Sequence, residues 1–188
     1  MENGILSDMD LLNQARYIRR KLRETPEIFD WKQLLIPQLT LAAALACSAF
    51  SIYKPSLISY SIFFGSFSIL ALVFWVYQCL RNKQTANKIQ DIGLEVCARI
   101  TSLALDKNVI NEGRELYKEI EQHESRLVEE VKRVGSSILI YTFLFLAWLV
   151  FVIGDISEVF RYEYTFMGNV FVIIALFLIV RDMMKKRR

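Results

Sequence analysis

Residues 50–60, FSIYKPSLISY, interrupt an apolar run that extends from Leu34 to Leu80. Lys54 is the one charged residue of that run, and Pro55 follows it directly. The apolar stretches before and after the interruption have about 20 and 24 residues, and each is long enough to cross the ~30 Å hydrocarbon core of a bilayer as a helix. The stretch therefore predicts a turn between two membrane helices, either beyond the far face of the bilayer or within it.

Two further apolar segments follow later in the chain. Asp, Glu, Lys and Arg are absent between Val134 and Gly154 and again between Thr165 and Val180. A soluble domain in a chain of 188 residues does not contain such blocks. The sequence therefore predicts an all-α integral membrane protein with four transmembrane helices, arranged as two hairpins with a cytosolic helical segment between them.

The distribution of basic residues predicts the orientation. Residues 1–33 hold six Lys and Arg, residues 81–133 hold ten, and the tail from Arg181 holds five, whereas the two short connections hold only Lys54 and Arg161. Basic segments stay on the cytosolic side, so both termini and residues 81–133 are expected there.

These observations divide the chain into five parts. We expect a cytosolic amphipathic N-terminal helix in 1–33, a first transmembrane hairpin in 34–80, a cytosolic helical linker in 81–133, a second hairpin in 134–181 and a basic cytosolic tail in 182–188.

The N-terminal part has an apolar stripe and a basic cluster. The stripe consists of Leu11, Ala15, Ile18 and Leu22, whose spacing predicts a helix over residues 5–24. Two interpretations remain open: the stripe packs against the other cytosolic helices, or the helix lies on an anionic membrane surface. In the second case the contacts would come from Arg16, Arg19, Arg20, Lys21 and Arg23.

The linker has two helical stripes separated by Asp106, Lys107 and Asn108, which predict a turn. The two helices are expected to bury each other in a hairpin or to pair with a neighbouring copy. The ten acids and ten bases of residues 81–133 balance, which argues against a nucleic-acid partner. The expected partners are the lipid bilayer, further copies of the chain in a homo-oligomer, and a cytosolic protein that binds residues 84–133.

The sequence offers no catalytic, cofactor or metal constellation, and we expect no enzyme and no cofactor. His123 is the only histidine and is predicted to be an exposed surface residue, while the three cysteines lack the spacing of a metal or disulfide pair. Within the apolar segments, Ser59, Gly65 and Ser66 are expected to allow close helix contact, or else to line a narrow pore in an oligomer.

The second short connection carries several charges. They are Asp155, Glu158, Arg161 and Glu163. We expect a short loop on the far side of the membrane, and the alternative is an acidic ring at the mouth of a pore.

Several stretches resemble the reticulon family of membrane-shaping proteins. FDWK at 29–32 is similar to the entry of the first reticulon hairpin, and residues 50–80 resemble the rest of that hairpin. TSLALDKNVINEGRELYKEI at 101–120 and SRLVEEVK at 125–132 are similar to the lead-in of the second. The resemblance covers about residues 29–181 and implies wedge-like hairpins that self-associate and bend a membrane, without catalysis. The loop at 155–163 is more charged than a reticulon turn.

The C-terminal tail has a further resemblance. It ends in KKRR, so Lys185 and Lys186 stand where the dilysine signal for retrieval to the endoplasmic reticulum requires lysines, and the alternative is a basic anchor that only fixes topology.

The alternative function is an oligomeric pore-forming or gating effector with four spans, such as a bacterial defence protein. Its cytosolic helices would sense a signal or a partner protein.

Overall fold

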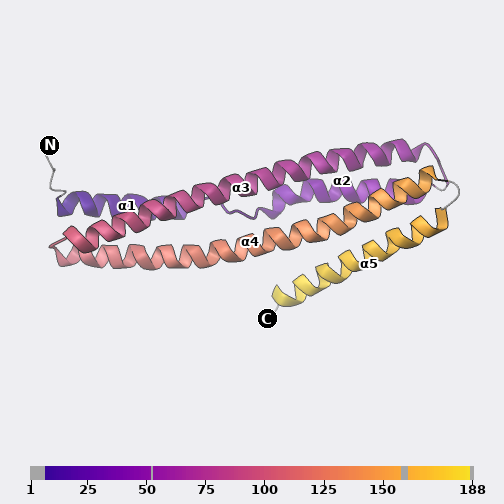
Figure 1. Ribbon diagram of the computed structural model, residues 1–188. Helices are drawn as coiled ribbons and strands as arrows, with labels where there is room; N and C mark the ends of the chain where they lie inside the picture. The colour runs from indigo at the N-terminus through magenta and orange to yellow at the C-terminus, as the bar shows by residue number, and fades with distance from the viewer. Residues whose placement is uncertain (1–6, 52, 158–160, 187–188) are drawn as a thin grey trace. The chain divides into compact units, whose positions relative to one another are not determined.

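The computed structural model describes residues 7–51, 53–157 and 161–186, with the side chains of 161, 185 and 186 left out. These ranges contain helices and no strand, which confirms the predicted all-helical class. The helices are α1 (Asp8–Glu24), α2 (Trp31–Phe50), α3 (Leu57–Leu103), α4 (Lys107–Ile156) and α5 (Arg161–Lys186) (Figure 1).

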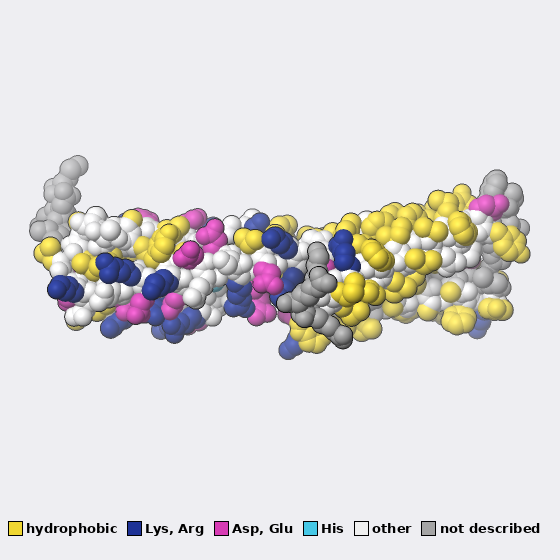
Figure 2. All heavy atoms as spheres, turned by 90° about the horizontal axis from the view of Figure 1, so that it is seen from below, with side chains coloured by type: hydrophobic (Ala, Val, Ile, Leu, Met, Phe, Trp, Pro, Cys, Tyr) yellow, Lys and Arg dark blue, Asp and Glu magenta, His cyan; other side chains and the backbone are white. Residues whose placement is uncertain are grey.

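Four of the helices are long and apolar enough to cross a membrane. They are α2, α3, α4 and, within α5, the stretch Tyr162–Met184. Figure 2 shows the corresponding surface covered by apolar side chains, whereas Lys, Arg, Asp and Glu gather on the part built from α1 and the polar stretches of α3 and α4. The chain is therefore a multi-pass membrane protein.

The two longest helices continue past the positions where the sequence changes from apolar to polar. α3 has 47 residues and α4 has 50, so each is about 70–75 Å long, more than twice the thickness of a hydrocarbon core. Between them, Asp106 caps α4, since its side chain accepts a hydrogen bond from the amide of Asn108 (2.8 Å). The turn thus lies at residues 104–106, slightly before the predicted Asp106–Asn108.

The chain forms two compact units. The polar unit comprises the described part of Met1–Phe29 together with Gln78–Lys132, and the apolar unit comprises the described parts of Asp30–Tyr77 and Arg133–Arg188. α3 and α4 each contribute one stretch to both units, whereas α1 belongs to the polar unit and α2 and α5 belong to the apolar unit.

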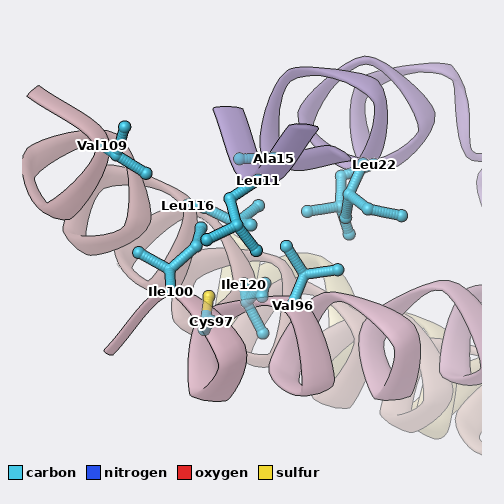
Figure 3. Packing of buried hydrophobic residues seen from close by; sticks show 10 residues of the cluster. Leu11, Ala15, Leu22, Val96, Cys97, Ile100, Val109, Leu116 and Ile120 are labelled. Carbon is cyan, nitrogen blue, oxygen red and sulfur yellow. The ribbon is translucent and has the colours of Figure 1, made fainter. Parts of the chain in front are cut away.

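The polar unit is a three-helix bundle with its own core. The whole stripe predicted for α1 is buried, with Leu11 and Ala15 fully excluded from solvent. Figure 3 shows these side chains pointing between α3 and α4. The core members are Leu11, Ala15, Ile18, Leu22, Val96, Cys97, Ile100, Val109, Leu116 and Ile120.

Polar contacts hold both ends of the N-terminal segment in this bundle. At its start, the Asp8 carboxylate accepts hydrogen bonds from the amides of Leu105 (3.4 Å) and Asp106 (3.0 Å), in the turn between α3 and α4. At its end, the amide of Ile28 donates to the buried Glu130 carboxylate (2.7 Å). The segment is therefore anchored at two places as well as along its apolar stripe.

Candidate functional site

A ladder of hydrogen bonds joins α2 to α3 inside the apolar unit. Three α3 side chains donate to α2-side carbonyl oxygens: Ser61 to Ala44 (2.8 Å), Ser68 to Pro37 (2.7 Å) and Trp75 to Asp30 (3.4 Å). The donors are seven residues apart, as are the acceptors, which run in the opposite direction. Two antiparallel helices therefore meet along one seam, with a polar contact every two turns.

α4 joins this ladder on the side of α3 that faces α2. The indole Nε1 of Trp148 donates to the hydroxyl of Ser61 (2.9 Å), and the hydroxyls of Tyr141 and Ser68 are hydrogen-bonded to each other. Ser68 has a single proton, which goes to the Pro37 carbonyl, so Tyr141 must be the donor to Ser68. All four side chains are buried, and their polar atoms satisfy each other where lipid offers no partner.

Gly65 lies between the two serines of the ladder. A β-carbon at this position would overlap the indole ring of Trp148, so glycine is what lets α4 approach α3 here. Close contact within the chain is confirmed for Gly65, whereas Ser59 and Ser66 are exposed on the outer side of α3 and do not pack inside one copy. In the sequence, the seven-residue spacing of Ser61, Ser68 and Trp75 is the signal that separates the packed side of α3 from its exposed side.

Asp155 fastens the end of α4 to the end of α2. Its carboxylate accepts hydrogen bonds from the buried hydroxyls of Ser48 (3.1 Å) and Ser51 (2.6 Å). Of the other residues in the predicted charged connection, Glu163 is exposed at the start of α5. Glu158 and the side chain of Arg161 lie outside the described residues.

In the polar unit, Arg19 connects α1 to a row of glutamates on α4. Its guanidinium binds Glu112 (2.6 Å) and Glu119 (2.7 Å) and lies 3.2 Å from Glu115, while Arg23 also binds Glu119 (2.9 Å). The hydrogen bond from Arg19 lowers the pKa of Glu119, and those glutamates raise the pKa of Arg19 further. These contacts and the buried stripe show α1 packed against the other helices, the first of the two interpretations.

The remaining residues of the predicted basic cluster have different surroundings. Arg20 and Lys21 lie near Glu24 of their own helix (3.5 and 3.4 Å), and Arg16 is exposed. Contact of the five bases with a membrane surface stays a prediction. The side chains of Lys185 and Lys186, the proposed retrieval signal, lie outside the described residues.

The prediction that His123 is an exposed surface residue is wrong. The residue is partly buried beside Leu22, Arg23 and Arg126, and its Nδ1 atom is buried without a hydrogen-bond partner. Burial lowers the pKa of His123, the positive charge of Arg126 lowers it further, and Glu130 opposes them. The polar residues on either side of His123 in the sequence suggested an exposed position. In the structure, α1 covers this side of α4 and partly buries the ring.

The thiols and carboxylates of the described residues do not come together as a metal site. Cys79 and Cys97 are buried, and the thiol of Cys97 donates to the carbonyl of Gly113 (3.7 Å). Burial raises the pKa of Cys97, which keeps it as an unreactive thiol. The contacts described above hold helices together and do not assemble a reacting centre.

The apolar unit offers a polar ladder closed within the chain, and the polar unit offers a charged three-helix surface. Comparison of the chain with protein-family models, with curated proteins and with solved structures finds no match.

Proposed function

We propose that this chain is a non-enzymatic, four-span membrane protein that shapes or organises a membrane through self-association. In this proposal, residues 34–80 and 134–181 form two transmembrane hairpins, and residues 81–133 and both termini lie in the cytosol. The observation that carries it is the outward-facing apolar surface. In each of the four candidate spans, only 17–28% of the 18-residue apolar stretch is buried within the chain. The rest is available to lipid and to other copies.

The closed polar ladder supports a structural role. The buried hydroxyls of Ser61, Ser68 and Tyr141 and the indole of Trp148 bond to one another or to backbone carbonyls. These polar groups are therefore already hydrogen-bonded within the chain and are not free to line a water-filled path through one copy. A single copy is better suited to displacing lipid than to conducting ions.

The contact of Asp155 with Ser51 supports complete crossing of the bilayer. It brings the end of α4 beside the connection between α2 and α3, so both short connections lie at one end of the apolar unit. Tyr53 and Lys54 are exposed in that connection. Charged groups at this end favour water or headgroups beyond the far face over a turn within the hydrocarbon core.

The reticulon resemblance extends the proposal to the endoplasmic reticulum of a eukaryotic cell, with the terminal lysines as a retrieval signal. In a bacterium the same architecture would act in the inner membrane, and the basic tail would serve as a topology anchor.

Reconstitution tests the proposal. The purified full-length chain is placed in liposomes at increasing protein-to-lipid ratios, and electron microscopy is combined with release of a trapped fluorescent dye. Tubules or strongly curved vesicles that retain the dye, absent from protein-free liposomes, are the expected result. Spherical vesicles that remain unchanged at every ratio would refute the shaping function.

A pore formed by several copies is the second candidate. It is favoured by the exposed hydroxyls of Ser59 and Ser66 on the outer side of α3, which would line a path between copies. Dye release without tubules would support it, and Ser59→Leu together with Ser66→Leu should then abolish the release. The matched control Ile62→Leu, on the same outward side, should leave it unchanged.

A further inference from the structure

The polar unit has one helix face that α1 does not cover. Glu119 on α4 binds Arg19 of α1, and Tyr117, two residues before Glu119, points to the opposite side of α4. On α3, Leu94 lies two residues before the buried Val96 and therefore also faces the side opposite α1. We call this side of α3 and α4, between residues 83–101 and 110–131, the open face.

The open face has the pattern of a surface that packs against another helix. Its apolar members include Leu94, Tyr117 and Val128, whose exposed fractions are 41%, 54% and 49%. Along α3 its positions are separated alternately by four and three residues, the spacing of a helix that packs along its length with a partner. These α3 positions are Lys83, Asn87, Gln90, Leu94 and Thr101, with the buried Cys97 at the border between the open face and the core.

Two hollows along the open face leave room for side chains of a partner. One lies beside Thr101, Ile110 and Tyr117, and the other beside Lys83 and Glu124. The opposite side of the same helix pair already accepts the apolar stripe of α1, which shows that two antiparallel helices of this kind bury a third.

The open face carries charges of both signs: Lys83, Lys132 and Glu124 line one hollow, and Arg114 and Lys118 line the other. Within the described ranges, neither Lys83 nor Glu124 forms an ion pair, although both line one hollow. On the α1 side, by contrast, Arg19, Arg23 and Arg126 all bind glutamates. A partner that presents a glutamate to Lys83 and a lysine to Glu124 would complete the open face.

A second copy of this chain meets that requirement. A two-fold axis parallel to the α3 and α4 stretches of the polar unit places α3 of one copy beside α4 of the other. Cys97 lies beside Gly113, so Leu94 is level with Tyr117 along the two antiparallel helices. The same arrangement brings Leu94 against Tyr117, and Lys83 within reach of Glu124, across the interface.

We propose that the open face is the surface through which two copies of this chain pair, with α3 of each against α4 of the other. The inference rests on the proposed function, because that function requires the chain to associate with itself. It assigns self-association to the polar unit, on the side opposite α1.

A charge exchange between copies tests this pairing. Full-length chains with donor and acceptor fluorophores are mixed in liposomes, and energy transfer reports the paired fraction. Lys83→Glu alone and Glu124→Lys alone each place like charges at both contacts and should weaken pairing roughly five- to tenfold. Mixing the two variants restores both contacts between copies and should return pairing to within about twofold of the wild type.

The mixed sample separates contact between copies from damage within one copy. Like charges within each chain persist in the mixture, so a defect that arises inside the chain would not be rescued. The control Lys88→Glu, at an exposed α3 position outside the open face, should leave pairing unchanged. Failure of the mixture to recover, an equal effect of Lys88→Glu, or a wild-type chain that does not pair would each overturn the inference.

The outcomes also distinguish this inference from the proposed function. If the wild-type chain forms tubules but shows no pairing through the open face, the proposed interface is refuted and the membrane-shaping function is supported. Intact, rescued pairing in vesicles that remain spherical would refute the shaping function and keep the interface.

Discussion

Gly65 shows how one missing side chain positions two membrane helices. Because its β-carbon would overlap the Trp148 ring, Gly65→Ala should destabilise the apolar unit by about 1–3 kcal/mol as α3 and α4 are forced apart. The hydrogen bond from Trp148 to Ser61 would be strained by the same shift. Unfolding of the detergent-solubilised chain by a denaturing detergent, followed by tryptophan fluorescence, measures the loss.

Gly135 supplies the matched control in α4. Nothing surrounds the space that its β-carbon would occupy, so Gly135→Ala adds a methyl group without a clash. Alanine is better than glycine inside a helix by about 0.5–1 kcal/mol, and this variant should be neutral or slightly stabilised. A Gly65→Ala chain as stable as Gly135→Ala would contradict the close packing at Trp148.

His123 should make the stability of the polar unit depend on pH. Its pKa is lowered from the ordinary 6.5, so the unfolded chain binds this proton more readily than the folded one. The contribution to stability is complete above about pH 6.5 and is lost as the pH falls towards the folded-state value. Charged groups near the ring are Arg126 and Glu130 on α4, and Arg23 of α1 and Glu119 of α4 line the same hollow.

His123→Gln isolates this effect, since the chain has only 1 histidine and ordinary carboxyl groups titrate at lower pH. Urea unfolding in mild detergent at pH 7.5 and pH 5.5, followed by circular dichroism, should show a larger loss of stability for the wild type than for the variant. Equal losses would mean that the histidine is not shielded in the folded chain.

At the scale of the element, the attachment of α1 depends on Arg19 more than on its basic neighbours. Arg19→Met leaves Glu112 and Glu119 without their main partner and should weaken docking of α1 by about 1–3 kcal/mol. Arg20→Met removes only an exposed contact with Glu24 and should cost less than about 0.5 kcal/mol. Hydrogen exchange of α1 amides in the full-length chain, read by mass spectrometry, gives both values.

The outcome for α1 shows what a sequence pattern specifies. The stripe of Leu11, Ala15, Ile18 and Leu22 predicted a helix and its buried side, because a period of 3.6 residues leaves one surface for burial. The same pattern did not distinguish a protein core from a membrane surface, since both are apolar. That choice depends on Arg19 reaching α4 residues 93–100 positions later in the sequence, a distance at which local patterns carry no information.

The long helices illustrate a second limit. The four apolar segments were predictable because the absence of charges over about 20 residues has few explanations other than lipid. The sequence alone divided the chain at residues 80 and 134, where polarity changes, yet α3 and α4 run through both positions. Backbone hydrogen bonding from one turn to the next is indifferent to whether lipid or water surrounds the helix.

For the whole molecule, the two units rely on different forces. The polar unit buries an apolar core away from water, whereas the spans of the apolar unit gain little from burying one apolar surface against another in lipid. The apolar unit accordingly uses close contact at Gly65 and hydrogen bonds from Ser61 and Ser68. The proposed division of labour, lipid contact by one unit and pairing by the other, follows from this difference.

The orientation of the whole chain gives the last prediction. With Cys47, Cys79 and Cys97 replaced by alanine, single cysteines are introduced at Lys54, Glu163 and Leu105, all at exposed positions. If both short connections cross to the far side, a membrane-impermeant thiol reagent added there to sealed vesicles should label Lys54→Cys and Glu163→Cys. Leu105→Cys, in the turn of the polar unit, should be labelled only from the cytosolic side. Weak labelling of Lys54→Cys and Glu163→Cys from either side, recovered when detergent opens the membrane, would instead indicate connections held within the bilayer.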